Sequence, residues 1–196
     1  MLTYLKNRIR FVMKFFAKYA HQIGCTPNTI TMIGFVTAVA SAILYSFRVN
    51  ILLASVLYFL SGFFDVLDGT IASSFDETSV FGGFLDSLLD RYSDAIVMMG
   101  IIFGGYCNLS WGMAALVGTL LVSYARARGE VENITMASVG LAERAERILI
   151  ILIASLLTLV YENALLMCII LLAIITHVTV LQRGYNVWKN TKTTER

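Results

Sequence analysis

The sequence is poor in charged residues for its length. Only 14% of its 196 residues are charged, 58% are hydrophobic, there is a single proline, and the mean hydropathy is +0.75. In a soluble domain roughly a quarter of the residues are charged, because its surface has to stay hydrated. The composition therefore excludes an ordinary soluble domain and indicates an integral membrane protein.

Other scarcities exclude further classes of protein. Cys25, Cys107 and Cys168 lie far apart, without the spacing of a zinc site or a disulfide framework, so we expect free thiols. The formal net charge is only +2 and the basic residues lie at the ends of apolar runs, so we expect no nucleic-acid partner. The basic, aromatic N-terminus has no small-residue cleavage site, so we expect no cleaved signal peptide.

Long apolar runs dominate the rest of the chain, several of them close to the roughly 20 residues that a helix needs to cross a bilayer. We predict six transmembrane helices, at residues 28–47, 51–74, 81–105, 109–128, 143–161 and 164–188. The segment KNRIRFVMKFFAK, within residues 1–22, mixes cations with aromatic residues and predicts an amphipathic helix in the membrane interface. An unstructured basic tail is the alternative. Without repeats or linkers, we expect one all-α domain over residues 1–196, with its six-helix core at 28–188.

The distribution of basic residues predicts the orientation in the membrane. Thirteen of the fifteen lysines and arginines lie in the N-terminal segment, around residues 126–147, or at 183–196. The loops near residues 107–110 and 161–163 carry none. Since basic loops stay on the cytoplasmic side, we expect both termini and the active site to face the cytoplasm of a cell-membrane protein.

Four aspartates interrupt the apolar pattern at the cytoplasmic ends of two consecutive spans. Asp65 and Asp68 are three residues apart, and Asp86 and Asp90 are four apart, so each pair shares one helix face. A short loop makes the two helices antiparallel neighbours, and their carboxylates therefore converge. Without a cation they would repel one another and be costly to bury. Oxygen ligands of this kind predict Mg²⁺ or Mn²⁺, one ion or a pair, rather than zinc.

This stretch resembles the signature of the CDP-alcohol phosphotransferase family. The pattern D-x-x-D-G-x-x-A spans residues 65–72, and G-x-x-x-D-x-x-x-D spans residues 82–90. The resemblance implies six membrane helices in a homodimer, and transfer of a substituted phosphate from a CDP-linked donor to an acceptor hydroxyl, with CMP leaving. One position departs from the pattern: the family has arginine after the alanine, and here Ser73 stands there. Arg91 is a candidate to compensate for it.

Roles for individual residues follow from the resemblance. It implies that the four aspartates hold two divalent ions and that Asp90 is also the general base. It also implies that the donor's nucleotide and diphosphate are bound by a set of small and polar residues: Asn28, Thr31, Gly69, Ser73 and Ser79. Helix capping explains Thr31 and Ser79 equally well. Asp94, one turn beyond Asp90, is not assigned as a ligand, and a supporting role and pairing with Arg91 both stay open.

Three arginines indicate the acceptor. Arg126, Arg147 and Arg183 lie at the cytoplasmic ends of the last three predicted spans, and guanidinium groups match phosphate oxygens. Ion pairs at helix ends are the alternative explanation. The segments around them resemble the branch of the family that makes phosphatidylinositol phosphate or its archaeal ether-lipid counterpart, which implies inositol phosphate as the acceptor and a CDP-linked lipid as the donor. Glycerol phosphate, serine and a CDP-inositol donor remain alternatives.

Two other classes compete with an enzyme. A transporter also places carboxylates inside the membrane, although it predicts charges near the bilayer midplane and repeated halves, and the sequence shows neither. A non-catalytic family member is the second alternative, for which Ser73 is the main argument.

Overall fold

The structure is a computed structural model that describes residues 2–136, 139–141 and 143–194, and within these residues it contains helices and connecting turns only. The helices are α1 Leu2–Gln22, α2 Pro27–Ser46, α3 Ile51–Ser74, α4 Val80–Phe103, α5 Leu109–Val131, α6 Arg144–Leu157 and α7 Ala164–Thr194. The predicted all-α class is thus confirmed.

Polar residues fix where several helices begin. The Thr26 hydroxyl accepts a hydrogen bond from the Thr29 amide at 3.3 Å, and Pro27 occupies the first turn, where its missing N–H costs nothing. The same kind of side-chain cap precedes the next three helices, at Asn50, Ser79 and Asn108. These caps satisfy amides that have no partner within the helix.

The helix boundaries agree closely with the predicted spans at all but two ends. α6 ends at Leu157 rather than at residue 161, because the chain turns there, with the Tyr161 amide donating to the Leu157 carbonyl at 2.8 Å. α7 continues to Thr194 rather than ending at 188, so its polar last turns extend past the apolar segment. Hydropathy marks where apolar residues stop, and a helix need not stop there.

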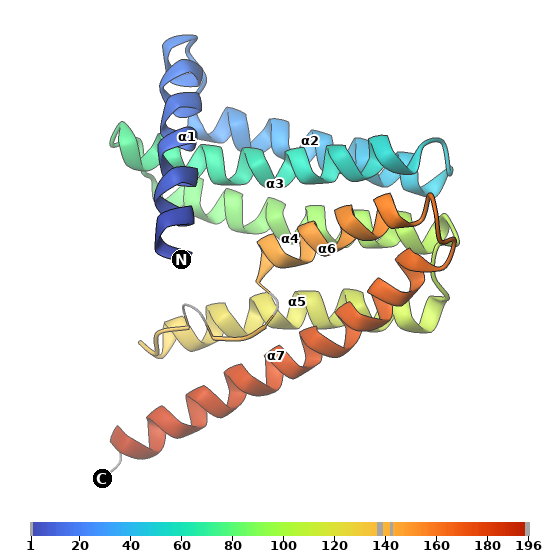
Figure 1. Ribbon diagram of the computed structural model, residues 1–196. Coiled ribbons are helices and arrows are strands. Elements are labelled where there is room, and N and C mark those ends of the chain that lie inside the picture. The colour runs from blue at the N-terminus through green and yellow to red at the C-terminus, as the bar shows by residue number, and fades with distance from the viewer. Residues whose placement is uncertain (1, 137–138, 142, 195–196) are drawn as a thin grey trace.

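The helices α2, α3 and α4 form one group and α5 and α7 form a second group (Figure 1). α2 packs against both α3 and α4, α5 packs against α7, and α6 lies between the groups with contacts to α3 and α7. α1 runs crosswise to the bundle and packs against α3. Its Met13, Ala17 and Ala20 join Leu67 and Ile71 in a small core.

Three helices are long and apolar enough to cross a membrane: α2, α3 and α7 up to Thr191, judged over the described residues. They confirm three of the six predicted spans as membrane-capable and support a membrane protein. α4 carries four charged residues along its length, and α6 has only 14 residues, about 21 Å of helix. A transmembrane course for α4, α5 and α6 therefore stays a prediction.

Candidate active site

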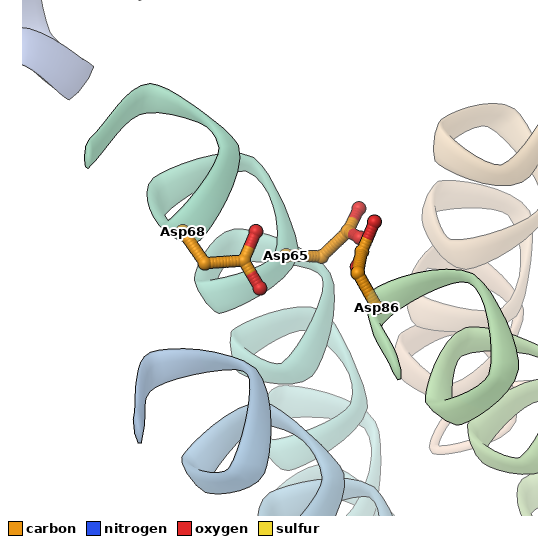
Figure 2. A group of neighbouring side chains, drawn as sticks. All are labelled: Asp65, Asp68 and Asp86. Atoms are coloured by element: carbon orange, nitrogen blue, oxygen red, sulfur yellow. The ribbon is translucent and has the colours of Figure 1, made fainter. Parts of the chain in front are cut away.

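Three of the four predicted aspartates form a compact acidic cluster. Figure 2 shows Asp65 and Asp68 on α3 beside Asp86 on α4. One carboxylate oxygen from each lies within 4.8 Å of the others, with Asp68 buried and the other two half-buried. The buried Oδ1 of Asp86 has no hydrogen-bond partner among the described residues. An all-oxygen group with an unsatisfied acceptor is a fitting site for Mg²⁺ or Mn²⁺.

Asp90 lies next to this cluster but is not part of it. Its Oδ1 is 2.6 Å from Nη1 of Arg144, and its Oδ2 is 3.7 Å from Nη1 of Arg91. The same Arg144 nitrogen is 2.8 Å from Oδ2 of Asp65. Arg144 therefore connects the acidic cluster to Asp90, the predicted general base.

A cavity of about 200 Å³ opens on the α2 side of the cluster. Four of the five predicted donor-binding residues line it, together with two aspartates of the cluster: Asn28, Thr31, Gly69, Ser79, Asp68 and Asp86. No lysine or arginine is among its described lining residues. Any anionic ligand held there depends on backbone amides, hydroxyls and a bound cation for charge compensation.

The predicted donor-binding residues differ in what they do in the structure. The Thr31 hydroxyl lies 2.5 Å from Oδ2 of Asp68, so it contacts the acidic cluster directly. Ser79 caps α4 and also lines the cavity. Ser73 is not brought to the cavity, since it is exposed and its hydroxyl donates to the Gly69 carbonyl at 2.8 Å.

Two glycines keep this cavity open in different ways. A Cβ on Gly69 would meet no atom within 4 Å, so the space beside this residue is open. A Cβ on Gly82 would lie 2.8 Å from Oγ of Ser79 and 3.1 Å from Oδ1 of Asn28. Gly82 thus allows two lining residues to approach the backbone of α4.

A second cavity, also about 200 Å³, lies on the α5–α6–α7 side. Five arginines line this cavity. They are the three predicted acceptor residues and two others: Arg126, Arg147, Arg183, Arg91 and Arg144. Four acidic residues also line the cavity, so its wall combines five arginines with four carboxylates: Asp65, Asp90, Asp94 and Glu143. This concentration of guanidinium groups suits a phosphate-bearing ligand.

Each predicted acceptor arginine also has a protein partner. Arg126 pairs with Glu130 at 2.9 Å, and Arg147 pairs with Asp94 at 2.7 Å. Arg183 is buried and donates to two backbone carbonyls, of Val122 at 2.5 Å and Val139 at 2.9 Å. These contacts fix the side chains at the wall of the cavity.

Sequence reasoning missed Arg144 and underestimated Asp94. Arg144 lies three residues before Arg147, on the same helix face, and this spacing was the available signal. The structure pairs Asp94 with Arg144 and Arg147 of α6, and places Arg91 against Asp90 and the Ser87 carbonyl. No sequence pattern identifies these partners, because α6 reaches α4 only through the folding of the whole chain.

Apolar helices and a partly buried acidic cluster between two cavities indicate a membrane protein with a site suited to a divalent metal ion. Residues 25–181 match the model of the CDP-alcohol phosphatidyltransferase family, and the chain belongs to this family.

Two archaeal relatives are similar to it over almost their full length. The archaetidylinositol phosphate synthase of Pyrococcus horikoshii is 38% identical over 191 residues, 96% of this chain and 97% of the relative. The enzyme of the same name from Methanothermobacter thermautotrophicus is 42% identical over 188 residues, 95% of each chain.

A solved structure resembles the fold closely. The phosphatidylinositol phosphate synthase of Mycobacterium tuberculosis with CDP-DAG bound superposes with a TM-score of 0.80 at 26% identity, covering 90% of this chain and 94% of that one. A second structure of that protein, in complex with manganese and citrate, has the same TM-score.

Proposed function

We propose that the protein transfers the lipid-bearing phosphate of a CDP-linked lipid to a hydroxyl group of inositol phosphate and releases CMP. The observation that carries this proposal is the position of the four aspartates between two cavities of opposite character. The described lining of one cavity has no lysine or arginine and includes four of the five predicted donor-binding residues, whereas five arginines line the other cavity. The names of the archaeal relatives support an inositol phosphate acceptor, and the CDP-DAG bound to the mycobacterial enzyme supports a CDP-linked lipid donor.

The metal assignment follows from the acidic cluster. Asp65, Asp68 and Asp86 hold the divalent cation, and Asp90 is a fourth ligand if a second ion binds. When bound, Mg²⁺ or Mn²⁺ neutralises the donor diphosphate and stabilises the charge on departing CMP. The manganese complex of the mycobacterial enzyme supports a metal of this type.

The chain's own groups then act on the acceptor. Arg126, Arg147 and Arg183 bind its phosphate, and Arg144 fixes Oδ1 of Asp90. Oδ2 of Asp90 takes the proton of the acceptor hydroxyl. The acceptor oxygen forms a bond to the lipid-bearing phosphorus, the bond from this phosphorus to the CMP oxygen breaks, and CMP leaves with the electron pair.

The same proposal includes a membrane orientation. Six helices cross the bilayer, the termini and both cavities face the cytoplasm, and α1 lies in the interface. On α1, Val12, Phe15 and Tyr19 are exposed while the opposite face packs on α3, which suits contact with acyl chains. Side chains before residue 12 lie outside the described part, so the role of the first cations remains a prediction, as does the homodimer.

CMP release by the purified protein in lipid bilayers tests the function. CDP-archaeol, CDP-diacylglycerol and CDP-inositol are each combined with inositol phosphate, glycerol phosphate or serine, in Mg²⁺ or Mn²⁺. We expect turnover with inositol phosphate, and a loss of at least about 100-fold in kcat/KM in Arg147→Ala. Glu162→Gln, an exposed substitution at the opposite end of the bundle, is the control for charge removal.

The other outcomes separate the alternatives. Turnover with serine, or an unchanged Arg147→Ala, would overturn the acceptor and leave the family assignment standing. Turnover only with CDP-inositol would overturn the CDP-linked lipid as the donor and identify CDP-inositol instead. Cation flux without CMP release would favour a transporter.

A further inference from the structure

A buried carboxylate that the proposed reaction does not use is part of the lining of the arginine-lined cavity. Asp94 is only 5% exposed and sits one helical turn beyond Asp90 on α4. Its Oδ2 accepts a hydrogen bond from Nη2 of Arg147 at 2.7 Å. Its Oδ1 accepts from the Tyr58 hydroxyl at 3.0 Å and from Nε of Arg144 at 3.3 Å.

These contacts join three helices through one side chain. Tyr58 comes from α3, Asp94 from α4, and both arginines from the first turn of α6. Tyr58 and Arg147 are buried as deeply as Asp94, at 3% exposure each. A buried charge without partners is strongly destabilising, so this group of four side chains holds together as a unit.

Asp94 thereby sets the position of two residues that face the substrate cavity. Arg147 and Arg144 both line the cavity assigned to the acceptor. One carboxylate thus restrains both guanidinium groups. Nη1 of Arg144 also contacts Asp65 and Asp90, so this side chain is held from two sides. A guanidinium that is fixed before the ligand arrives loses less conformational entropy on binding.

We propose that Asp94 is a positioning residue for the acceptor's phosphate group: it holds Arg144 and Arg147 in place at the wall of the cavity. The inference rests on the proposed function, in which this cavity binds a phosphate-bearing acceptor. It assigns Asp94 to acceptor binding rather than to metal binding or donor binding, since Asp94 does not line the donor cavity and is not a member of the acidic cluster.

The charge of Asp94 has two opposing effects on phosphate binding, and the acceptor KM shows which effect is larger. Asp94 also reduces the positive potential of the cavity, so its neutralisation could strengthen the attraction for phosphate. If positioning dominates, removing the charge of Asp94 raises the acceptor KM. If charge compensation dominates, the acceptor KM falls.

Steady-state kinetics of Asp94→Asn in bilayers distinguishes these cases. Asparagine keeps the shape and an acceptor for Tyr58 but loses the charge that fixes the two arginines. We expect the KM for inositol phosphate to rise about tenfold or more, the donor KM to stay within about twofold, and kcat at saturating acceptor to fall less than about threefold. A merely structural role would instead lower the folded fraction and leave both KM values unchanged.

Two tyrosine variants form a matched pair in case Asp94→Asn folds poorly. Tyr58→Phe removes one hydrogen bond to Asp94 and should raise the acceptor KM by about two- to fivefold. Tyr45→Phe removes a comparably buried hydrogen bond, to Ser155 at 2.7 Å, outside both cavities, and should leave both KM values unchanged.

The outcomes separate this inference from the proposed function. An acceptor KM that is unchanged or lower in both Asp94→Asn and Tyr58→Phe overturns the role of Asp94. If the wild-type protein used glycerol phosphate instead, the proposed acceptor would fail, but a raised KM for that phosphate would still support Asp94. Turnover with serine alone would overturn both.

Discussion

Nη1 of Arg144 lies 2.6 Å from Oδ1 of Asp90, so the cationic wall of one cavity directly contacts the proposed general base. The same nitrogen lies 2.8 Å from Asp65. Replacing Arg144 with glutamine removes the charged contact to both carboxylates and leaves Asp90 with the longer contact to Arg91. We expect kcat/KM for CMP release to fall about 100-fold or more, and Arg144→Lys to recover little, because an ammonium lacks the planar fork of donors.

The control for this prediction is Arg128→Gln on α5. Arg128 pairs with Glu132 in an exposed i,i+4 ion pair and lines neither of the two polar cavities. Such pairs contribute little, so we expect activity within about twofold of the wild type. An Arg144→Gln variant with wild-type turnover would show that Asp90 acts without this partner.

The Thr31 hydroxyl supports the metal site through Asp68. Thr31→Val keeps the shape of the side chain but removes the 2.5 Å hydrogen bond to Oδ2. Partners of metal ligands typically contribute about 10- to 100-fold in metal affinity, so we expect the Mn²⁺ concentration for half-maximal turnover to rise about tenfold. Thr37→Val is the matched control, because Thr37 lies on the same helix and its hydroxyl donates to the Gly34 carbonyl at 2.7 Å.

Removal of the metal should abolish turnover reversibly. We expect a chelator to stop CMP release and added Mn²⁺ or Mg²⁺ to restore it. Asp86→Asn should reduce kcat by at least about 100-fold and weaken Mn²⁺ binding measured by calorimetry, because Asp86 contributes to the three-carboxylate group. Turnover that survives exhaustive chelation would rule out the metal-dependent mechanism.

Gly82 is expected to be intolerant even of alanine. A Cβ there would lie 2.8 Å from the Ser79 hydroxyl, which caps α4, and 3.1 Å from the Asn28 side chain. Displacing the cap should cost about 1 kcal/mol of stability and should raise the donor KM, since both neighbours line the donor cavity. The control is Gly184→Ala, because a Cβ on Gly184 would meet no atom within 4 Å. This variant should leave the donor KM unchanged.

Arg48 is expected to stabilise the fold without taking part in substrate binding. It donates to the carbonyls of Gly104 and Gly105 at the end of α4, and its guanidinium lies 5.0 Å from the centre of the Tyr106 ring. Arg48→Ala should reduce the free energy of unfolding by about 1–3 kcal/mol and leave both KM values unchanged. Thermal unfolding in detergent and CMP release measure the two effects separately; a raised KM would connect this end of the bundle to the site.

The sequence predicted the helices and the convergence of three aspartates because both depend on short-range patterns. Thr26 and Pro27 mark a helix start by local chemistry, and the spacing of Asp65, Asp68 and Asp86 places their carboxylates on facing helices. The ends of α6 and α7 were predicted less well. At Leu157 the chain turns within an apolar run that has no glycine or proline to signal it.

Pairing between distant residues could not be predicted. Arg144 and Arg147 reach Asp94 across 50 and 53 residues, and the choice among several nearby carboxylates is made by helix packing. Ser73 could not be interpreted from the sequence either. Its hydroxyl bonds to the backbone of its own helix, and no described basic residue takes the place of the family arginine in the donor cavity.

The two cavities draw on different halves of the chain. Residues between Pro27 and Asp86 line the donor cavity, whereas the acceptor cavity takes most of its wall from residues between Val122 and Arg183. Under the proposed function, substitutions in the C-terminal helices change which alcohol is bound, while the nucleotide-binding residues of the N-terminal half stay intact. A single scaffold divided in this way can give rise to different lipid headgroups without a new catalytic centre.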